Sequence, residues 1–197
     1  MTQRENKMKK IGIILANEMR DVDLFVPLAI WRKSKIAVDL ISIEKKNSVM
    51  MESGVKVGCN STFDIVNTSQ YNALYFPGGT GVDRLLNGNW PVKNSVGPTK
   101  LFKSLEAFRL NANKFVLVTS SSSKIIHDNH LIGKSRIAGF TKDYRKDESI
   151  QEEIVINHNL VSVLGYYQLT EFALQVVELL QGQEIRSEIE ASLEFDY

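Results

Sequence analysis

A cluster of hydroxyl side chains that directly follows an apolar run is the part of this sequence best suited to chemistry. Residues 115–118 form a β-branched and aromatic run, which predicts a strand buried on both faces. Thr119 and four serines follow at once, and residues 124–126 indicate a helix. A strand that turns directly into a helix can hold a hydroxyl or thiol above the sheet as a nucleophile elbow, beside the positive helix end. The alternative interpretation is a serine-rich helix cap that only satisfies backbone donors.

Two other polar corners are predicted to meet this one. Residues 17–23 follow an apolar run at 10–16, and a Pro-Gly-Gly-Thr-Gly segment at 77–81 follows another at 71–76. Glycines permit positive φ angles and let the backbone come close to a bound ligand. Because ligands of parallel α/β sheets bind beyond the carboxyl ends of the strands, we expect the three corners to converge at one edge.

The elements that position these corners alternate between strands and helices. Strands are predicted at 10–16, 36–43, 71–76 and 115–118, at 135–140, and at 153–156 and 160–164 around a turn, with a small hairpin over 48–57. Helices are predicted at 21–32, 82–86, 99–110, 170–180 and 183–191. A short helix or turn is predicted over 61–66. Pro27 lies inside the first helical pattern, so that helix should begin late or be kinked. The alternation predicts a flavodoxin-like α/β fold, with a doubly wound, mostly parallel sheet, helices on both faces and one small hairpin.

Length and composition limit the remaining possibilities. The chain has 197 residues, of which 43% are hydrophobic and 24% charged, as in one globular domain. A formal net charge of +1 does not favour nucleic-acid binding, and no apolar run approaches the roughly 20 residues that span a bilayer. A single cysteine, Cys59, excludes a disulfide framework and suits a reducing cytosol. We expect a cytoplasmic protein with a polar tail over 1–9, one domain over 10–197, and no membrane partner.

Several stretches together resemble the ThiJ/PfpI superfamily, which has the class I glutamine amidotransferase-like fold. Asp23-Leu-Phe-Val-Pro27 is similar to a D-L-x-G-P segment of its isonitrile hydratase branch, and Tyr75-Phe-Pro-Gly-Gly79 to its apolar-apolar-P-G-G turn. Residues 171–182 resemble its last long helix, and residues 193–197 the acidic and aromatic end of the same branch. The superfamily includes glyoxalase-like and deglycase-type proteins, intracellular peptidases and isonitrile hydratases. The resemblance implies a homodimer and no cofactor.

The resemblance also shows where this chain departs from the pattern of its superfamily. Members place a cysteine at the elbow, a carboxylate from the first corner beside it, and often a histidine in the strand after the elbow helix. Here the acid position is Asp23, the cysteine position is Thr119 and the histidine position is Gly139. Cys59 lies in the hairpin region, far in sequence from every corner, and should not replace the missing thiol. The neighbouring His127 and His130 lack enough further ligands for a metal site, so we expect no metal.

Two classes of function follow from these residues. The first is a non-catalytic or altered relative that keeps a cleft for a small polar metabolite, and the loss of both cysteine and histidine favours it. The second is a hydratase, hydrolase or glyoxalase-like enzyme for small electrophiles, in which Asp23 directs a water or a hydroxyl of Thr119 or Ser120 attacks. The candidate catalytic residues are Asp23, Thr119 and Ser120, and the candidate backbone donors for an oxyanion or ligand are those of Gly78, Gly79, Ser120 and Ser121.

Overall fold

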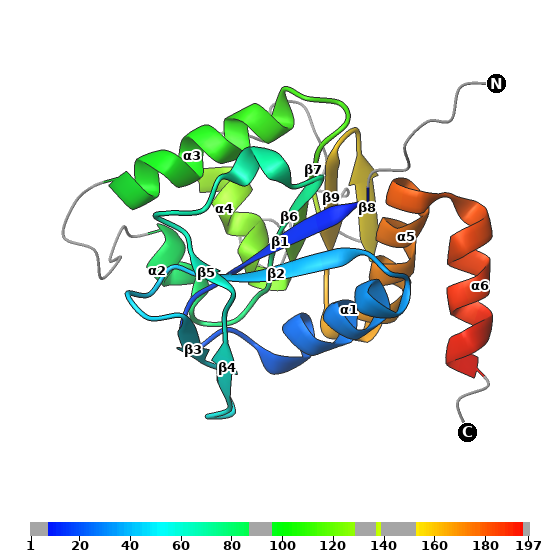
Figure 1. Cartoon of the computed structure of the whole chain (residues 1–197), viewed down its shortest axis with the longest axis horizontal. Coiled ribbons are helices and arrows are strands. Elements are labelled where there is room, and N and C mark those ends of the chain that lie inside the picture. Colours follow the sequence, from blue (N-terminus) through cyan, green and yellow to red (C-terminus); the bar gives the residue numbers. More distant parts are fainter. Residues whose placement is uncertain (1–7, 87–95, 129–136, 139–152, 195–197) are drawn as a thin grey trace.

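The computed structural model describes residues 8–86, 96–128, 137–138 and 153–194 (Figure 1). Its main sheet contains, from one edge to the other, β5 (Ser61–Thr62), β2 (Ala37–Ser42), β1 (Lys10–Leu15), β6 (Ala73–Phe76), β7 (Phe115–Thr119), β9 (Leu160–Val163) and β8 (Ile154–Asn157). Neighbouring strands are parallel except for the antiparallel pair β9 and β8. The strands β3 (Ser48–Met50) and β4 (Lys56–Gly58) form a separate antiparallel hairpin. The mostly parallel α/β fold predicted from the sequence is therefore confirmed.

The helices cover both faces of the sheet. Figure 1 shows α1 (Asp21–Lys33) and α5 (Leu169–Gln181) on one side, with α6 (Gln183–Glu194) packed outside α5. On the other side lie α2 (Val82–Leu86), α3 (Val96–Arg109) and α4 (Ser123–Asp128). In the described part of the chain, short 3-10 helices also connect the elements: η1 (Thr68–Gln70), η2 (Ser120–Ser122) and η5 (Tyr166–Gln168). Strands β6 and β9 are buried along their whole length and β1 and β7 except at their first residues, as expected for strands covered on both faces.

Pro27 was expected either to delay the start of the first helix or to kink it, and the late start is wrong. The helix begins at Asp21 and continues past Pro27 to Lys33. Proline has no N–H group, so the carbonyl of Asp23, four residues earlier, has no helical donor. The hydroxyl of Tyr75 on β6 donates a hydrogen bond to that carbonyl. The sheet thus supplies the donor that the helix lacks, directly beside the first corner.

Two other boundaries differ from the sequence predictions. The segment predicted as a short helix or turn begins with strand β5, which pairs with β2 through two residues, and only then turns. Helix α3 begins at Val96, three residues before its predicted start. Of the strand predicted at 135–140, only residues 137–138 belong to the described part, and the tail is described only from residue 8.

Candidate functional site

The three predicted corners meet at the carboxyl edge of the sheet. Asp23 lies in the first turn of α1, Thr119 is the last residue of β7, and Gly78 follows β6. The Thr119 hydroxyl donates to Asp23 Oδ2 at 2.9 Å, and the Gly78 N–H donates to both Asp23 Oδ2 at 2.9 Å and Thr119 Oγ1 at 3.0 Å. Each pair of these residues is therefore joined by a hydrogen bond. The triangle of Asp23, Gly78 and Thr119 is the centre of the candidate site.

The hydroxyl of Thr119 has most of its hydrogen-bonding capacity in use. A hydroxyl donates one hydrogen bond and accepts two. Thr119 Oγ1 donates to Asp23 and accepts from Gly78, while the Tyr75 hydroxyl lies 3.5 Å away. Thr119 is 1% exposed and Asp23 is 0% exposed. The hydroxyl is consequently held inside the protein by neighbours, with little surface open to a reactant.

Burial dominates the electrostatics of Asp23. Loss of solvent raises the pKa of its carboxyl group above the ordinary value, and the more distant Glu52 adds a smaller push in the same direction. The Arg20 guanidinium and the hydrogen bonds from Thr119 and Gly78 act against that rise without cancelling it. Within the described residues, Asp23 Oδ1 accepts no hydrogen bond, and its nearest cation is Arg20 at 3.6 Å. Asp23 is thus a buried acid with one oxygen fixed and the other turned toward a guanidinium that is 31% exposed.

The serine cluster is tied to the backbone of neighbouring segments. Ser121 Oγ accepts from the Gly79 N–H at 3.0 Å and lies 3.2 Å from the Gly79 carbonyl, to which it can donate. Ser122 Oγ accepts from the Thr119 N–H at 2.8 Å and donates to the Phe76 carbonyl at 2.6 Å. Among the described residues, neither serine accepts from an N–H group in the first turn of α4, so these bonds join neighbouring segments, and the capping interpretation stays a prediction. Ser120 begins η2, and its side chain lies outside what the structure describes.

The glycine turn after β6 packs against the first corner of the chain. Gly79 has φ of +118°, and a Cβ atom there would lie 2.5 Å from the Arg20 nitrogen. A Cβ atom on Gly81 would lie 2.1 Å from the Asn17 carbonyl oxygen, closer than two such atoms can approach. The glycines therefore permit contact between two backbone segments, where the sequence had suggested contact with a ligand.

Two residues of the site were not identified from the sequence. Tyr75 reaches both Asp23 and Thr119 from a buried strand, and Arg20 faces Asp23 from the residue that caps α1. The signal for Tyr75 was a polar hydroxyl in a run that is otherwise buried, directly before the glycine turn. Cys59 is half-buried beside β4, and burial raises the pKa of its thiol to about 11. Its Sγ lies 4.0 Å from the Val57 carbonyl, and the thiol stays protonated near neutral pH.

The expectations about metal binding and membrane spans can be compared with the structure only over its described residues. Across residues 8–86, 96–128, 137–138 and 153–194, no group of three or more His, Cys, Asp or Glu side chains is placed to hold a metal. In the same segments no helix is both long and apolar enough to cross a membrane. The side chain of His127, and the whole of His130 and Gly139, lie outside the described residues.

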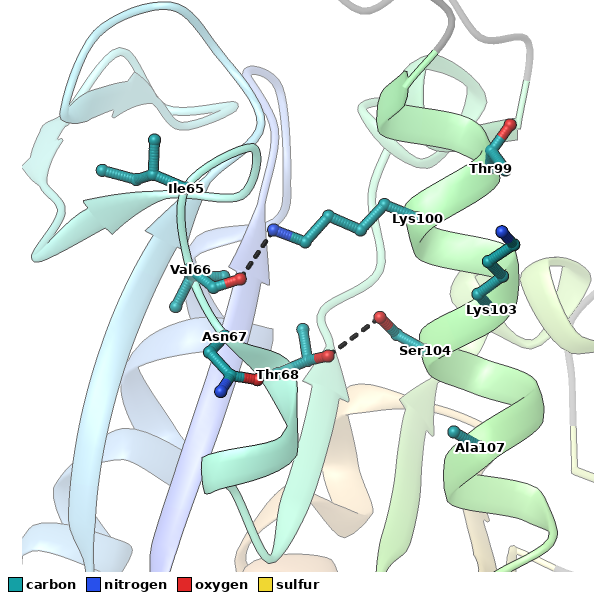
Figure 2. Close-up of a pocket in the computed structure, with 9 residues that line it drawn as sticks. All are labelled: Ile65, Val66, Asn67, Thr68, Thr99, Lys100, Lys103, Ser104 and Ala107. Carbon is teal, nitrogen blue, oxygen red and sulfur yellow. Dashed lines mark hydrogen bonds between the residues drawn. The ribbon is translucent and has the colours of Figure 1, made fainter.

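A hollow of about 640 Å³ lies between the segment before η1 and helix α3, and the triangle does not line it. Figure 2 shows Lys100 extending from α3 to the Val66 carbonyl, and Ser104 joined to Thr68. The Lys100 ammonium donates to the carbonyls of Phe63, Asp64 and Val66 at 2.7, 2.9 and 2.6 Å. Lys100 therefore satisfies three backbone carbonyls of the turn over residues 63–66, and it links that turn to α3. The hollow is the space between these two elements.

Comparison with known proteins gives consistent results over most of the chain. The model of the DJ-1/PfpI family matches residues 9–179. A Mycoplasma pneumoniae protein with no assigned activity is 28% identical over 184 residues, covering 89% of this chain and 84% of its own length. A deglycase of Pyrococcus horikoshii is 32% identical over 76 residues, which are 39% of this chain and 45% of that protein.

Solved structures extend the likeness to the fold. The oxidised form of Toxoplasma gondii DJ-1 superimposes with a TM-score of 0.81 at 19% identity, covering 96% of this chain and all of that one. At this identity the superposition concerns the fold alone. The triangle of Asp23, Gly78 and Thr119 thus occupies the carboxyl edge of a sheet whose architecture is shared with that protein.

Proposed function

This chain belongs to the DJ-1/PfpI family, and we propose that it binds a small polar metabolite without forming a covalent intermediate. The observation that carries the proposal is the state of Thr119. Its hydroxyl is 1% exposed, donates to Asp23 and accepts from Gly78. A hydroxyl is a weak nucleophile unless a base removes its proton and leaves a lone pair free for attack. Here one lone pair accepts from the Gly78 N–H, and the buried oxygen has little surface open to a reactant.

The backbone donors support the same conclusion. An oxyanion hole needs N–H groups that are directed at the position of the developing charge. The Gly78 N–H is shared between Asp23 and Thr119, and the Gly79 N–H donates to Ser121. Stabilising an oxyanion at either amide would first break these bonds. These two N–H groups therefore stabilise the folded corner instead of pointing at a ligand.

The metabolite would contact the polar groups at the outer side of the triangle. The side chain of Arg20 is 31% exposed, and that of Ser121 is partly exposed. A guanidinium is suited to a carboxylate, which it can bind through two parallel N–H groups. We therefore propose small 2-oxo and 2-hydroxy carboxylates as the ligand class of this site.

One observation favours the enzymatic alternative. Asp23 combines a raised pKa with an oxygen 2.9 Å from the Thr119 hydroxyl, which is the arrangement of a general base beside a nucleophile. In that case Asp23 would take the hydroxyl proton, or a proton from a water, as a small electrophile such as methylglyoxal or an isonitrile is attacked. A kinship to the isonitrile hydratase branch in particular, as its motifs suggested, remains part of this alternative.

Turnover and binding assays on the same proteins separate the two functions. Wild type, Asp23→Asn and Thr119→Val would be incubated with methylglyoxal and with an isonitrile, and thermal shifts would be recorded with glyoxylate and lactate. The proposal expects no turnover above that of Thr119→Val, and a stabilisation by glyoxylate or lactate that Arg20→Gln removes. Lys35→Gln, an exposed lysine change outside the site, is the matched control for charge. Turnover that Asp23→Asn abolishes would establish the enzyme and refute the proposal, and absence of any thermal shift would also refute it.

We also propose a cytoplasmic homodimer, as the resemblance implied, with one domain over residues 10–197. Val22 and Phe25 support the dimer, because both are exposed on α1, at 42% and 41%, and lie one turn apart. Light scattering with wild type and with Phe25→Lys tests the oligomeric state. A monomeric wild type would refute the dimer.

A further inference from the structure

A second hollow, of about 400 Å³, lies beside the first corner and has a different chemistry. The loop that follows β2 and the β3–β4 hairpin form its walls, and three lysines line it: Lys45, Lys46 and Lys56. All three are exposed. Within the described residues none of the three ammonium groups forms an ion pair, so their charges are not neutralised by the protein itself.

The acid that also lines this hollow, Glu44, already has partners, although its cation Arg84 also pairs with Glu18 at 3.7 Å. Glu44 Oε1 accepts from the Asn17 N–H at 3.0 Å and lies 3.6 Å from the guanidinium of Arg84. The Glu44 side chain is 11% exposed and sits under the loop. The side chains that line the hollow nevertheless carry a net positive charge, because the three lysines outnumber the one acid, Glu44.

The position of the hollow suits a bound ligand. Asn17 follows β1 by two residues, and Lys45 and Lys46 follow β2 by three and four, so the hollow lies at the carboxyl ends of two parallel strands. Parallel α/β sheets bind their ligands at such ends. Ser48 contributes a hydroxyl, and Met50, which is 45% exposed, contributes apolar surface. A volume of about 400 Å³ is within the range of small-molecule pockets.

We propose that this hollow binds a small phosphorylated metabolite, with its phosphate held by Lys45, Lys46 and Lys56. A phosphate monoester carries about −1.5 to −2 charges at pH 7, and clustered ammonium groups bind it as point charges. A sugar or other polar body would meet Ser48 and the side-chain amide of Asn17. Neither Asp23, Gly78 nor Thr119 lines this hollow, so the site is separate from the triangle and does not depend on the function proposed there.

The test is a titration with ribose 5-phosphate followed by amide chemical shifts in two-dimensional NMR spectra. We expect saturable shifts at Asn17, Lys45, Lys46 and Ser48, and tighter binding of ribose 5-phosphate than of inorganic phosphate, with no binding of ribose. The double variant Lys45→Gln/Lys46→Gln should weaken binding by about tenfold or more, since each ammonium lies within a few ångströms of the phosphate. Lys56→Gln should also weaken the binding of ribose 5-phosphate, because Lys56 lines the hollow from strand β4 of the hairpin.

The matched control removes the same charge from elsewhere. Lys35 and Lys103 are both exposed and neither lines this hollow, so Lys35→Gln/Lys103→Gln should leave the affinity within about twofold. An equal loss in both double variants would overturn the proposal, because binding would then follow net charge alone. Binding of inorganic phosphate as tightly as ribose 5-phosphate would also overturn it, since the hollow would then hold any anion.

Discussion

Removing the hydroxyl of Tyr75 tests how the helix and the sheet are joined at the candidate site. Tyr75 is fully buried, and its ring packs edge-on against Trp31, with 5.0 Å between centroids, and at a tilt against Phe172, with 5.8 Å between centroids. Tyr75→Phe keeps this packing and deletes only the hydroxyl. The Asp23 carbonyl then loses its donor, because Pro27 has no N–H group to replace it.

The expected magnitude follows from the burial of that carbonyl. A buried acceptor left without a partner costs about 1–3 kcal/mol of stability. The phenol itself is not a source of charge, because burial raises the pKa of Tyr75 well above its ordinary value and keeps it protonated. We therefore expect Tyr75→Phe to lower the free energy of unfolding by roughly 1–3 kcal/mol, measured by urea denaturation with circular dichroism.

A second substitution makes the explanation specific. Pro27→Ala restores an N–H group that can donate to the Asp23 carbonyl within α1. In that background Tyr75→Phe should be milder, with a coupling of about 1 kcal/mol between the two changes. Tyr71→Phe is the control, since the Tyr71 hydroxyl donates to Asp39 at 2.8 Å and has no relation to Pro27. If Tyr75→Phe and Pro27→Ala add within about 0.5 kcal/mol, as the control pair should, the proposed role of the carbonyl is wrong.

Three further changes test the corner, the glycine turn beside it and the connection at the end of α3. Because burial raises the pKa of Asp23, the folded protein binds the Asp23 proton more tightly than the unfolded chain does. The stability of the wild type should therefore fall as pH rises from about 4 through that raised pKa, while the urea midpoint of Asp23→Asn should change less with pH. Equal slopes of urea midpoint against pH for the two proteins would contradict this. Gly81→Ala should lower the melting temperature because its Cβ would lie 2.1 Å from the Asn17 carbonyl oxygen, and an unchanged melting temperature would show that the turn can move. Asn159→Ala should cost about 1–3 kcal/mol in urea denaturation, because its amide donates to the Phe108 carbonyl at 2.6 Å at the end of α3, and a loss below 0.5 kcal/mol would assign that role elsewhere.

The parts of the fold that could be predicted are those set by continuous patterns. The runs at β1, β6 and β7 are almost continuously apolar and show no polar alternation, which distinguishes a covered parallel strand from a half-exposed one. Once the strands were parallel, topology alone predicted that residues after their carboxyl ends would meet. The hydrogen bond between Asp23 and Thr119, which are 96 residues apart, follows from that rule.

The parts that could not be predicted depend on pairs of residues with no common local pattern. Pro27 indicated a disturbed helix, and only the position of Tyr75, 52 residues from Asp23, explains why the helix continues. Strand β5 has two residues, too few to show any alternation. The contact of Gly81 with Asn17 is likewise invisible in sequence, because a glycine that admits a ligand and one that admits a neighbouring backbone have the same requirement for space.

Thr119 shows why the shape of an elbow does not by itself imply reactivity. A thiol at this corner would have a small thiolate fraction even without activation, and a nearby helix end would increase it. A threonine hydroxyl gains nothing comparable, yet it forms stronger hydrogen bonds than a thiol and can bridge a carboxyl and an amide. In this protein it does so between Asp23 and Gly78, at 2.9 and 3.0 Å, inside a region closed to solvent. Attack by Thr119 would pass its proton to Asp23 along the existing hydrogen bond, but Thr119 is 1% exposed, so the corner would first have to open to a reactant. The function proposed above therefore assigns ligand contact to the partly exposed side chains of Arg20 and Ser121.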